Sequence, residues 1–147
     1  LRDTEESTSR GVAMIASAYA RVGLRDQDLW QAIILHILDS HISAFSAVTI
    51  ATLLHSAASL NADDPTDSLI DVLFSAAVLL PVQEYNPQSV ANLAWAASVV
   101  DVGDPPTLKW LLGMVESSVA GMGPIHLRQV HQFYLTLARN GWADRAS

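Results

Sequence analysis

The chain has 147 residues, half of them hydrophobic, and a formal net charge of −7. This length allows a single folded unit that buries about 70% of the surface of its unfolded chain. The sequence contains no cysteine, which excludes disulfide bonds, thiolate metal sites and thiol redox chemistry. Glycine and proline are sparse, and apolar residues do not alternate with a period of two, so the composition indicates an all-α fold.

Residues 1–8, which contain Asp3, Glu5 and Glu6, are interpreted as a solvated lead-in. After this segment we expect helices of two alternating kinds. Helices of the first kind have small and apolar residues at helical spacing, and they lie at 11–20, 49–58, 89–98 and 125–140. Helices of the second kind follow a polar break, and they lie at 29–38, 69–79 and 108–119.

The helices of the first kind align on one column, which we call the anchor. Its residues are Ala13, Ala51, Ala91 and His131, spaced 38, 40 and 40 residues apart. A fixed period of this length is typical of helical-repeat proteins. The sequence therefore predicts a right-handed α-solenoid of helix-turn-helix repeats with a 38–40 residue period. We expect one array over 1–147, with repeats at about 9–44, 45–83, 85–121 and a partial repeat at 125–147, as a fragment of a longer chain.

The helix boundaries carry their own signals. Asp64-Pro65 recurs 40 residues later as Asp104-Pro105. An aspartate can cap a helix N-terminus, and proline fits the first turn because no backbone donor is needed there. Gly23 and Gly141 each follow a helix of the first kind, where a left-handed cap favours glycine.

The segment 85–97, YNPQSVANLAWAA, resembles the signature of octotricopeptide-type repeats, which also occur in relatives that carry a C-terminal RAP domain. The segment 105–111, PPTLKWL, resembles the proline-rich start of the second helix of the same repeats. The other copies keep the period and the small residues but not the Asn-Pro-Gln and Trp. The resemblance implies an organellar protein of mitochondria or plastids that binds RNA, acts in RNA processing or belongs to an organellar ribosome.

The charge in the middle of the chain argues against generic RNA binding. Lys109 is the only Lys or Arg between Asp26 and Leu127, whereas the same segment carries eleven carboxylates. Nonspecific binding of nucleic acid depends on Lys and Arg side chains that displace counterions from the backbone. We therefore expect RNA near the ends of the array, and neighbouring proteins of a larger assembly on its acidic middle.

Repeat proteins can recognise RNA with few cations, because polar side chains at equivalent positions of each repeat contact one base. Positions three before, one after and eight after the anchor share one helix face. The candidate RNA-binding residues on this face are Arg10, Arg21, Thr52, Gln88, Asn92, Arg128, Gln132 and Arg139. The solvated face of an amphipathic helix would explain most of these residues equally well.

Other kinds of site are not expected. His36 and His41 are five residues apart, which places them on different faces of a helix, and the carboxylates do not follow a metal-binding spacing, so we predict no metal site. Phosphate-loop, nucleophile-elbow and acid-base motifs are missing from the sequence, so we predict a non-enzyme without cofactors. Trp95 and Trp110 are assigned to the core. The uncharged run 40–62 contains histidine and hydroxyl residues, so no membrane insertion is expected.

These features predict an RNA-associated helical-repeat protein that is a structural component of an organellar ribonucleoprotein. The mitochondrial ribosome is the favoured assembly and organellar rRNA the favoured partner, with a plastid as the alternative location. The alternative function is a protein-binding scaffold solenoid without direct RNA contact, because acidic surfaces suit basic protein partners.

Overall fold

The computed structural model describes the chain except residues 1, 41–43, 61–65, 101, 103 and 142–147, and it describes only the backbone of residues 2–7 and 66–68. The described part is all-helical and contains no β-strand. Its α-helices are α1 (Arg2–Val22), α2 (Gln27–Asp39), α3 (Ala47–Leu60), α4 (Thr66–Leu79), α5 (Pro87–Val99), α6 (Pro105–Ser118) and α7 (Pro124–Arg139). The one-turn 3-10 helices η2 (Val82–Glu84) and η3 (Val119–Gly121) follow α4 and α6.

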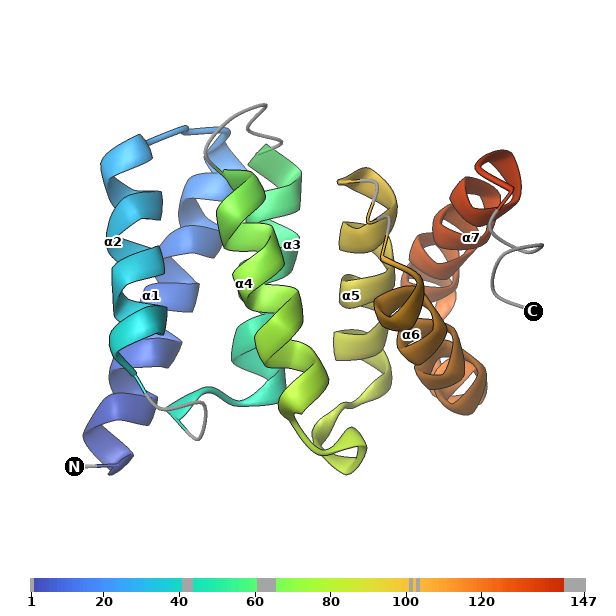
Figure 1. Cartoon of the computed structure of the whole chain (residues 1–147), viewed down its shortest axis with the longest axis horizontal. Helices are drawn as coiled ribbons and strands as arrows, with labels where there is room; N and C mark the ends of the chain where they lie inside the picture. Colours follow the sequence, from blue (N-terminus) through green and yellow to red (C-terminus); the bar gives the residue numbers. More distant parts are fainter. Residues whose placement is uncertain (1, 41–43, 61–65, 101, 103, 142–147) are drawn as a thin grey trace.

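The helices form two layers (Figure 1). In the first layer, α1 packs against α3, α3 against α5, and α5 against α7. In the second layer, α4 contacts both α2 and α6. The layers are joined because α4 packs on α3 and α6 packs on α5. Successive helix pairs therefore follow one another along the long axis of the molecule, from the N-terminus to the C-terminus.

The anchor residues show why small side chains recur in the first layer. Ala13, Ala51 and Ala91 are buried, each 3% exposed or less, where helices approach closely. His131, the fourth anchor residue, is exposed.

Local sequence signals explain most helix ends. The Oδ2 atom of Asp104 accepts the backbone N–H of Thr107 at 3.0 Å and caps α6, as the Asp-Pro pattern predicts. Gly23 and Gly141 have positive φ angles of 72° and 67°, which confirms the predicted left-handed caps. The capping prediction at Asp64-Pro65 lies outside the described residues.

The first helix begins earlier than the sequence predicts. Residues 2–8 belong to α1, which begins at Arg2 and continues without a break to Val22. The carboxylates of this segment favour the positive end of the helix dipole, so they extend the helix rather than end it.

The segment that resembles the octotricopeptide signature has a clear structural role. Asn86 caps α5, because its Oδ1 atom accepts the backbone N–H of Ser89 at 2.8 Å, and Pro87 occupies the first turn. The hydroxyl of Tyr85 donates to the carbonyl oxygen of Ala77 at 2.6 Å, which ties the start of α5 to α4. The Tyr85 ring also meets Trp110 edge-on, with 5.8 Å between the ring centroids.

Candidate nucleic-acid interface

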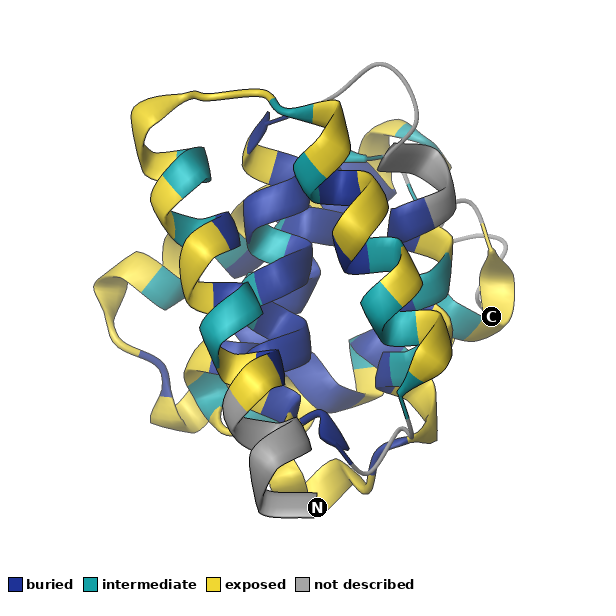
Figure 2. Ribbon diagram, turned by 90° about the vertical axis from the view of Figure 1, so that its left-hand side faces the viewer, coloured by how far each residue is buried: buried dark blue, intermediate teal, exposed yellow. Residues whose placement is uncertain are grey.

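One face of the first layer is left uncovered by the second layer. We call it the first-layer face and define it by the positions three before, one after, four after and eight after the anchor. In α3 all other side chains are buried, and in α5 Pro87 is the only further side chain that is not buried. Figure 2 shows the buried residues between the layers. The face consists of Arg10, Met14, Ser17, Arg21, Val48, Thr52, His55, Ser59, Gln88, Asn92, Trp95, Val99, Arg128, Gln132, Leu135 and Arg139.

All eight candidate residues of the sequence analysis lie on this face. Thr52 and Asn92 are half-buried, and the other six are exposed. Arg10 and Thr52 line the same pocket. The arginines of α1 and those of α7 are not brought together, because α3 and α5 lie between these two helices.

Apart from residues 2–7 of α1, which include Asp3, Glu5 and Glu6, the two layers differ in charge. In residues 8–22 of α1 and in the whole of α3, α5 and α7, the charged side chains are Arg10, Arg21, Arg128 and Arg139, with no carboxylate. The carboxylates of the middle of the chain belong to second-layer helices and to the connections between helices, as in Asp28, Asp39, Asp71, Glu84 and Glu116. The carboxylates in the middle of the sequence therefore do not belong to the first-layer face.

An aromatic pair crosses the boundary between α3 and α5 on this face. The rings of His55 and Trp95 lie 4.6 Å apart, centroid to centroid, and are tilted by 32°. Burial lowers the pKa of His55 from its ordinary value of 6.5, which favours the neutral ring. Trp95 packs against the core, as expected, but it is only half-buried.

His55 and Trp95 are not among the candidate residues predicted from the sequence. Both occupy the position four after the anchor, so the 40-residue register could have revealed that they are neighbours. Half-exposed aromatic rings of this kind can stack on nucleic-acid bases.

An amide pair crosses the next boundary, between α5 and α7. The Nε2 atom of Gln129 donates to Oδ1 of Asn92 at 3.1 Å. The Oε1 atom of Gln129 is buried and has no hydrogen-bond partner among the described residues. This hydrogen bond thus links the Asn92 side chain of α5 to α7.

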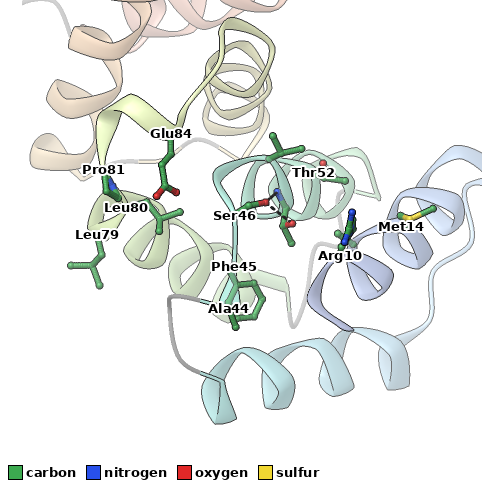
Figure 3. A pocket seen from close by; sticks show the side chains of 13 residues that line it. Arg10, Met14, Ala44, Phe45, Ser46, Thr52, Leu79, Leu80, Pro81 and Glu84 are labelled. Atoms are coloured by element: carbon green, nitrogen blue, oxygen red, sulfur yellow. Dashed lines mark hydrogen bonds between the residues drawn. The ribbon is translucent and has the colours of Figure 1, made fainter. Parts of the chain in front are cut away.

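A pocket of about 790 Å³ lies at the boundary between α1 and α3 (Figure 3). Arg10 and Met14 of α1 form one side, and Leu79, Leu80, Pro81 and Glu84, from the end of α4 to η2, form the other. The start of α3, from Ser46 to Thr52, lies between them. Ser46 caps this helix, because its Oγ atom accepts the backbone N–H of Thr49 at 3.1 Å.

The described residues form neither a metal-binding cluster nor a membrane-spanning helix. Among the described residues, no group of three or more His, Asp or Glu side chains is placed to hold a metal ion. Within the same part of the chain, no helix has the length and apolar character needed to cross a membrane.

Comparison with known proteins gave no match: no protein-family model, curated protein or solved structure shows significant similarity to this chain.

Proposed function

We propose that this protein is an RNA-associated, right-handed α-solenoid whose first-layer face holds single-stranded RNA. The observation that carries the proposal is the charge of that face, which has four arginines and no carboxylate. Arginine supplies both the charge and the planar donors that bind phosphate. The half-exposed His55 and Trp95 rings and the Asn92 and Gln88 amides supply stacking surfaces and polar groups for bases.

The proposed setting is an organellar ribonucleoprotein, with the mitochondrial ribosome as the first assembly to test and rRNA as the RNA. This part of the proposal is supported by the resemblance of 85–97 to octotricopeptide repeats. The candidate residues are spread over four helices and do not converge on one cleft, which supports a structural role.

A pair of matched double variants tests the RNA-binding face. Arg10→Gln/Arg128→Gln removes two charges from the face, while Arg25→Gln/Lys109→Gln removes two exposed charges from outside it. For single-stranded RNA, each lost phosphate contact lowers the salt slope of log K by about 0.7. We expect the first variant to lower the slope by about 1.4 and to weaken binding about tenfold at low salt. The second variant should bind like the wild type.

Fluorescence anisotropy with a labelled single-stranded RNA, over a range of salt concentrations, measures both quantities. Circular dichroism of each variant confirms that the helices are retained. Equal losses in the two double variants would mean that binding follows net charge and not the first-layer face, and the proposal would fail.

The acidic surface of the second layer supports a second candidate function, the binding of a protein partner. Asp28, Asp39, Asp71 and Glu116 are exposed there, and Lys109 is the only cation in its helices. This surface suits a basic protein, because opposite charges steer association. A pull-down from organellar extract, with and without nuclease, separates this candidate function from the first. Protein recovery that survives nuclease and is lost on Asp71→Asn/Glu116→Gln supports the scaffold role, whereas recovery of RNA without protein contradicts it.

A further inference from the structure

The pocket between α1, α3 and the α4–η2 connection has an uneven distribution of charge. Its cation, Arg10, and its carboxylate, Glu84, lie on opposite sides (Figure 3). Among the described residues neither side chain forms an ion pair. A ligand that spans the pocket must therefore offer an anionic group at one end and hydrogen-bond donors at the other.

Both sides of the pocket offer apolar surface, and the hydroxyl residues Ser46, Thr49 and Thr52 of α3 line the part between them. Met14 of α1 on one side, Leu80 and Pro81 on the other, and Val48 of α3 contribute carbon surface, and Met14 and Val48 are 66% and 50% exposed. A flat apolar ring can lie against such a surface. The volume of about 790 Å³ is within the roughly 300–1,000 Å³ of typical small-ligand sites.

The segment that carries Glu84 is fixed by hydrogen bonds. The backbone N–H of Glu84 donates to the carbonyl oxygen of Pro81 at 3.0 Å, and the N–H of Tyr85 donates to that of Val82 at 3.2 Å. The Tyr85 hydroxyl anchors the segment to Ala77 of α4. These bonds fix the backbone at Glu84, so the conformational entropy lost when its carboxylate binds a ligand is that of the side chain alone.

We propose that this pocket binds one nucleotide of the RNA and selects guanine, an inference that rests on the proposed RNA-binding function. Arg10 binds the phosphate, because it belongs to the cationic face along which the RNA backbone runs. The base lies between the apolar walls, and its Watson–Crick edge points to Glu84.

The selectivity follows from the hydrogen-bonding groups of the bases. An ionised carboxylate only accepts hydrogen bonds. Guanine presents two adjacent donors, N1–H and the N2 amine, which match the two oxygens of Glu84. Adenine and cytosine present one amine beside a ring nitrogen that is itself an acceptor, and uracil presents one N–H between two carbonyls. Guanine is the base that forms two hydrogen bonds with this carboxylate without placing an acceptor against it.

Labelled uridine 9-mers with a single central guanine, adenine, inosine or 7-deazaguanine test the proposal by fluorescence anisotropy. We expect the wild type to bind the guanine RNA about tenfold more tightly than the adenine RNA, as for other bidentate base contacts. The inosine RNA, which lacks the N2 amine, should bind more weakly than the guanine RNA. The 7-deazaguanine RNA, whose Watson–Crick edge is unchanged, should bind like it.

Substitutions separate the roles of the two charges. Glu84→Gln should abolish the preference for guanine over adenine, while Glu116→Gln, the same change on the second layer, should leave it intact. Arg10→Gln should weaken all four RNAs by a similar factor and keep the ratio between them, because a phosphate contact does not distinguish bases.

The outcomes separate this inference from the function on which it rests. If the wild type binds all four RNAs equally, the guanine pocket is overturned while the RNA-binding face stands. A pocket that takes a peptide segment instead of a nucleotide would give the same equal binding. If no RNA binds at any salt concentration, the proposed function fails and the inference fails with it.

Discussion

His55 illustrates how one residue couples packing to pH on the first-layer face. Its ring stacks on Trp95 and is half-buried. Burial lowers the pKa of His55 in the folded protein, whereas in the unfolded chain the pKa stays near its ordinary value of 6.5. Below about pH 6.5 the unfolded state therefore binds the proton more readily than the folded state. The contribution of neutral His55 to the free energy of unfolding is therefore fully present above about pH 6.5. It is lost as the pH falls from 6.5 toward the lower pKa of His55 in the folded protein.

We predict that His55→Phe reduces the loss of stability on acidification. Phenylalanine keeps an aromatic ring against Trp95 but cannot bind a proton. Urea denaturation at pH 7.5 and pH 5.5 gives the free energy of unfolding of each protein. The difference between the two pH values should be smaller in the variant than in the wild type. His131→Gln, at an exposed position on α7, is the control, and a pH dependence unchanged by His55→Phe would contradict the prediction.

Asn92 and Gln129 form a contact that the sequence does not predict. The sequence marks Asn92 as a free polar group for RNA, but its Oδ1 atom already accepts a hydrogen bond from Gln129. The amide N–H groups of Asn92 remain as its donors to a ligand. Its partner could not be identified from periodicity, because the two residues are 37 positions apart and the contact depends on how α5 and α7 pack.

The helices of the first layer each have one exposed face, but the local signals that start and end them differ from helix to helix. In α5 the signal is the Asn-Pro pair of the segment that resembles octotricopeptide repeats. The cap hydrogen bond of Asn86 satisfies a backbone donor that would otherwise lack a partner in the helix. This part of the segment is thus explained by helix initiation, without any ligand, while Gln88 and Asn92 point to the first-layer face.

We predict that Asn86→Ala lowers the free energy of unfolding by about 1 kcal/mol, because an alanine cannot cap the helix. Asn86→Ser keeps a side-chain oxygen at the cap and should retain most of the stability. Urea denaturation of both variants against the wild type measures the difference. If alanine and serine have the same effect, the cap hydrogen bond does not stabilise α5 as proposed.

The helices differ in how many of their residues are buried, because of their places in the array. Helices α3 and α5 have first-layer neighbours on both sides and a second-layer helix across from them. They contain ten and eight buried residues, whereas α2 has two buried residues, Trp30 and Ile33. Local unfolding should therefore be easiest at the two ends of the array.

Hydrogen exchange measured by mass spectrometry tests this expectation. Amides of α3 and α5 should exchange most slowly, and those of α2 and α7 should exchange faster. The physical reason is that opening a central helix exposes apolar surface on several neighbours at once. Uniform protection of all the helices, or slower exchange in α2 than in α3, would contradict the prediction.

Much of this fold could be predicted from the sequence because its signals are local. The small residues at the anchor column, the Asp104 cap and the left-handed glycines act within one or two turns of helix, so they are visible along the chain. The shared face of Arg10, Thr52, Asn92 and Arg128 also follows from periodicity. The predicted start of the first helix was wrong, because a run of carboxylates is compatible both with a solvated segment and with the positive end of a helix dipole.

The helical character of the chain, the recurrence of its helices and the positions that share one helix face all follow from local patterns in the sequence. The contacts between helices of one layer depend on packing between residues about 40 positions apart, so they are seen in the folded structure alone. That packing separates the arginines of the first layer from most of the carboxylates of the middle of the chain. It also joins His55 to Trp95, and Arg10 to the pocket that contains Glu84. Charge and composition can be counted along a chain, but the surface on which they act is set by the fold.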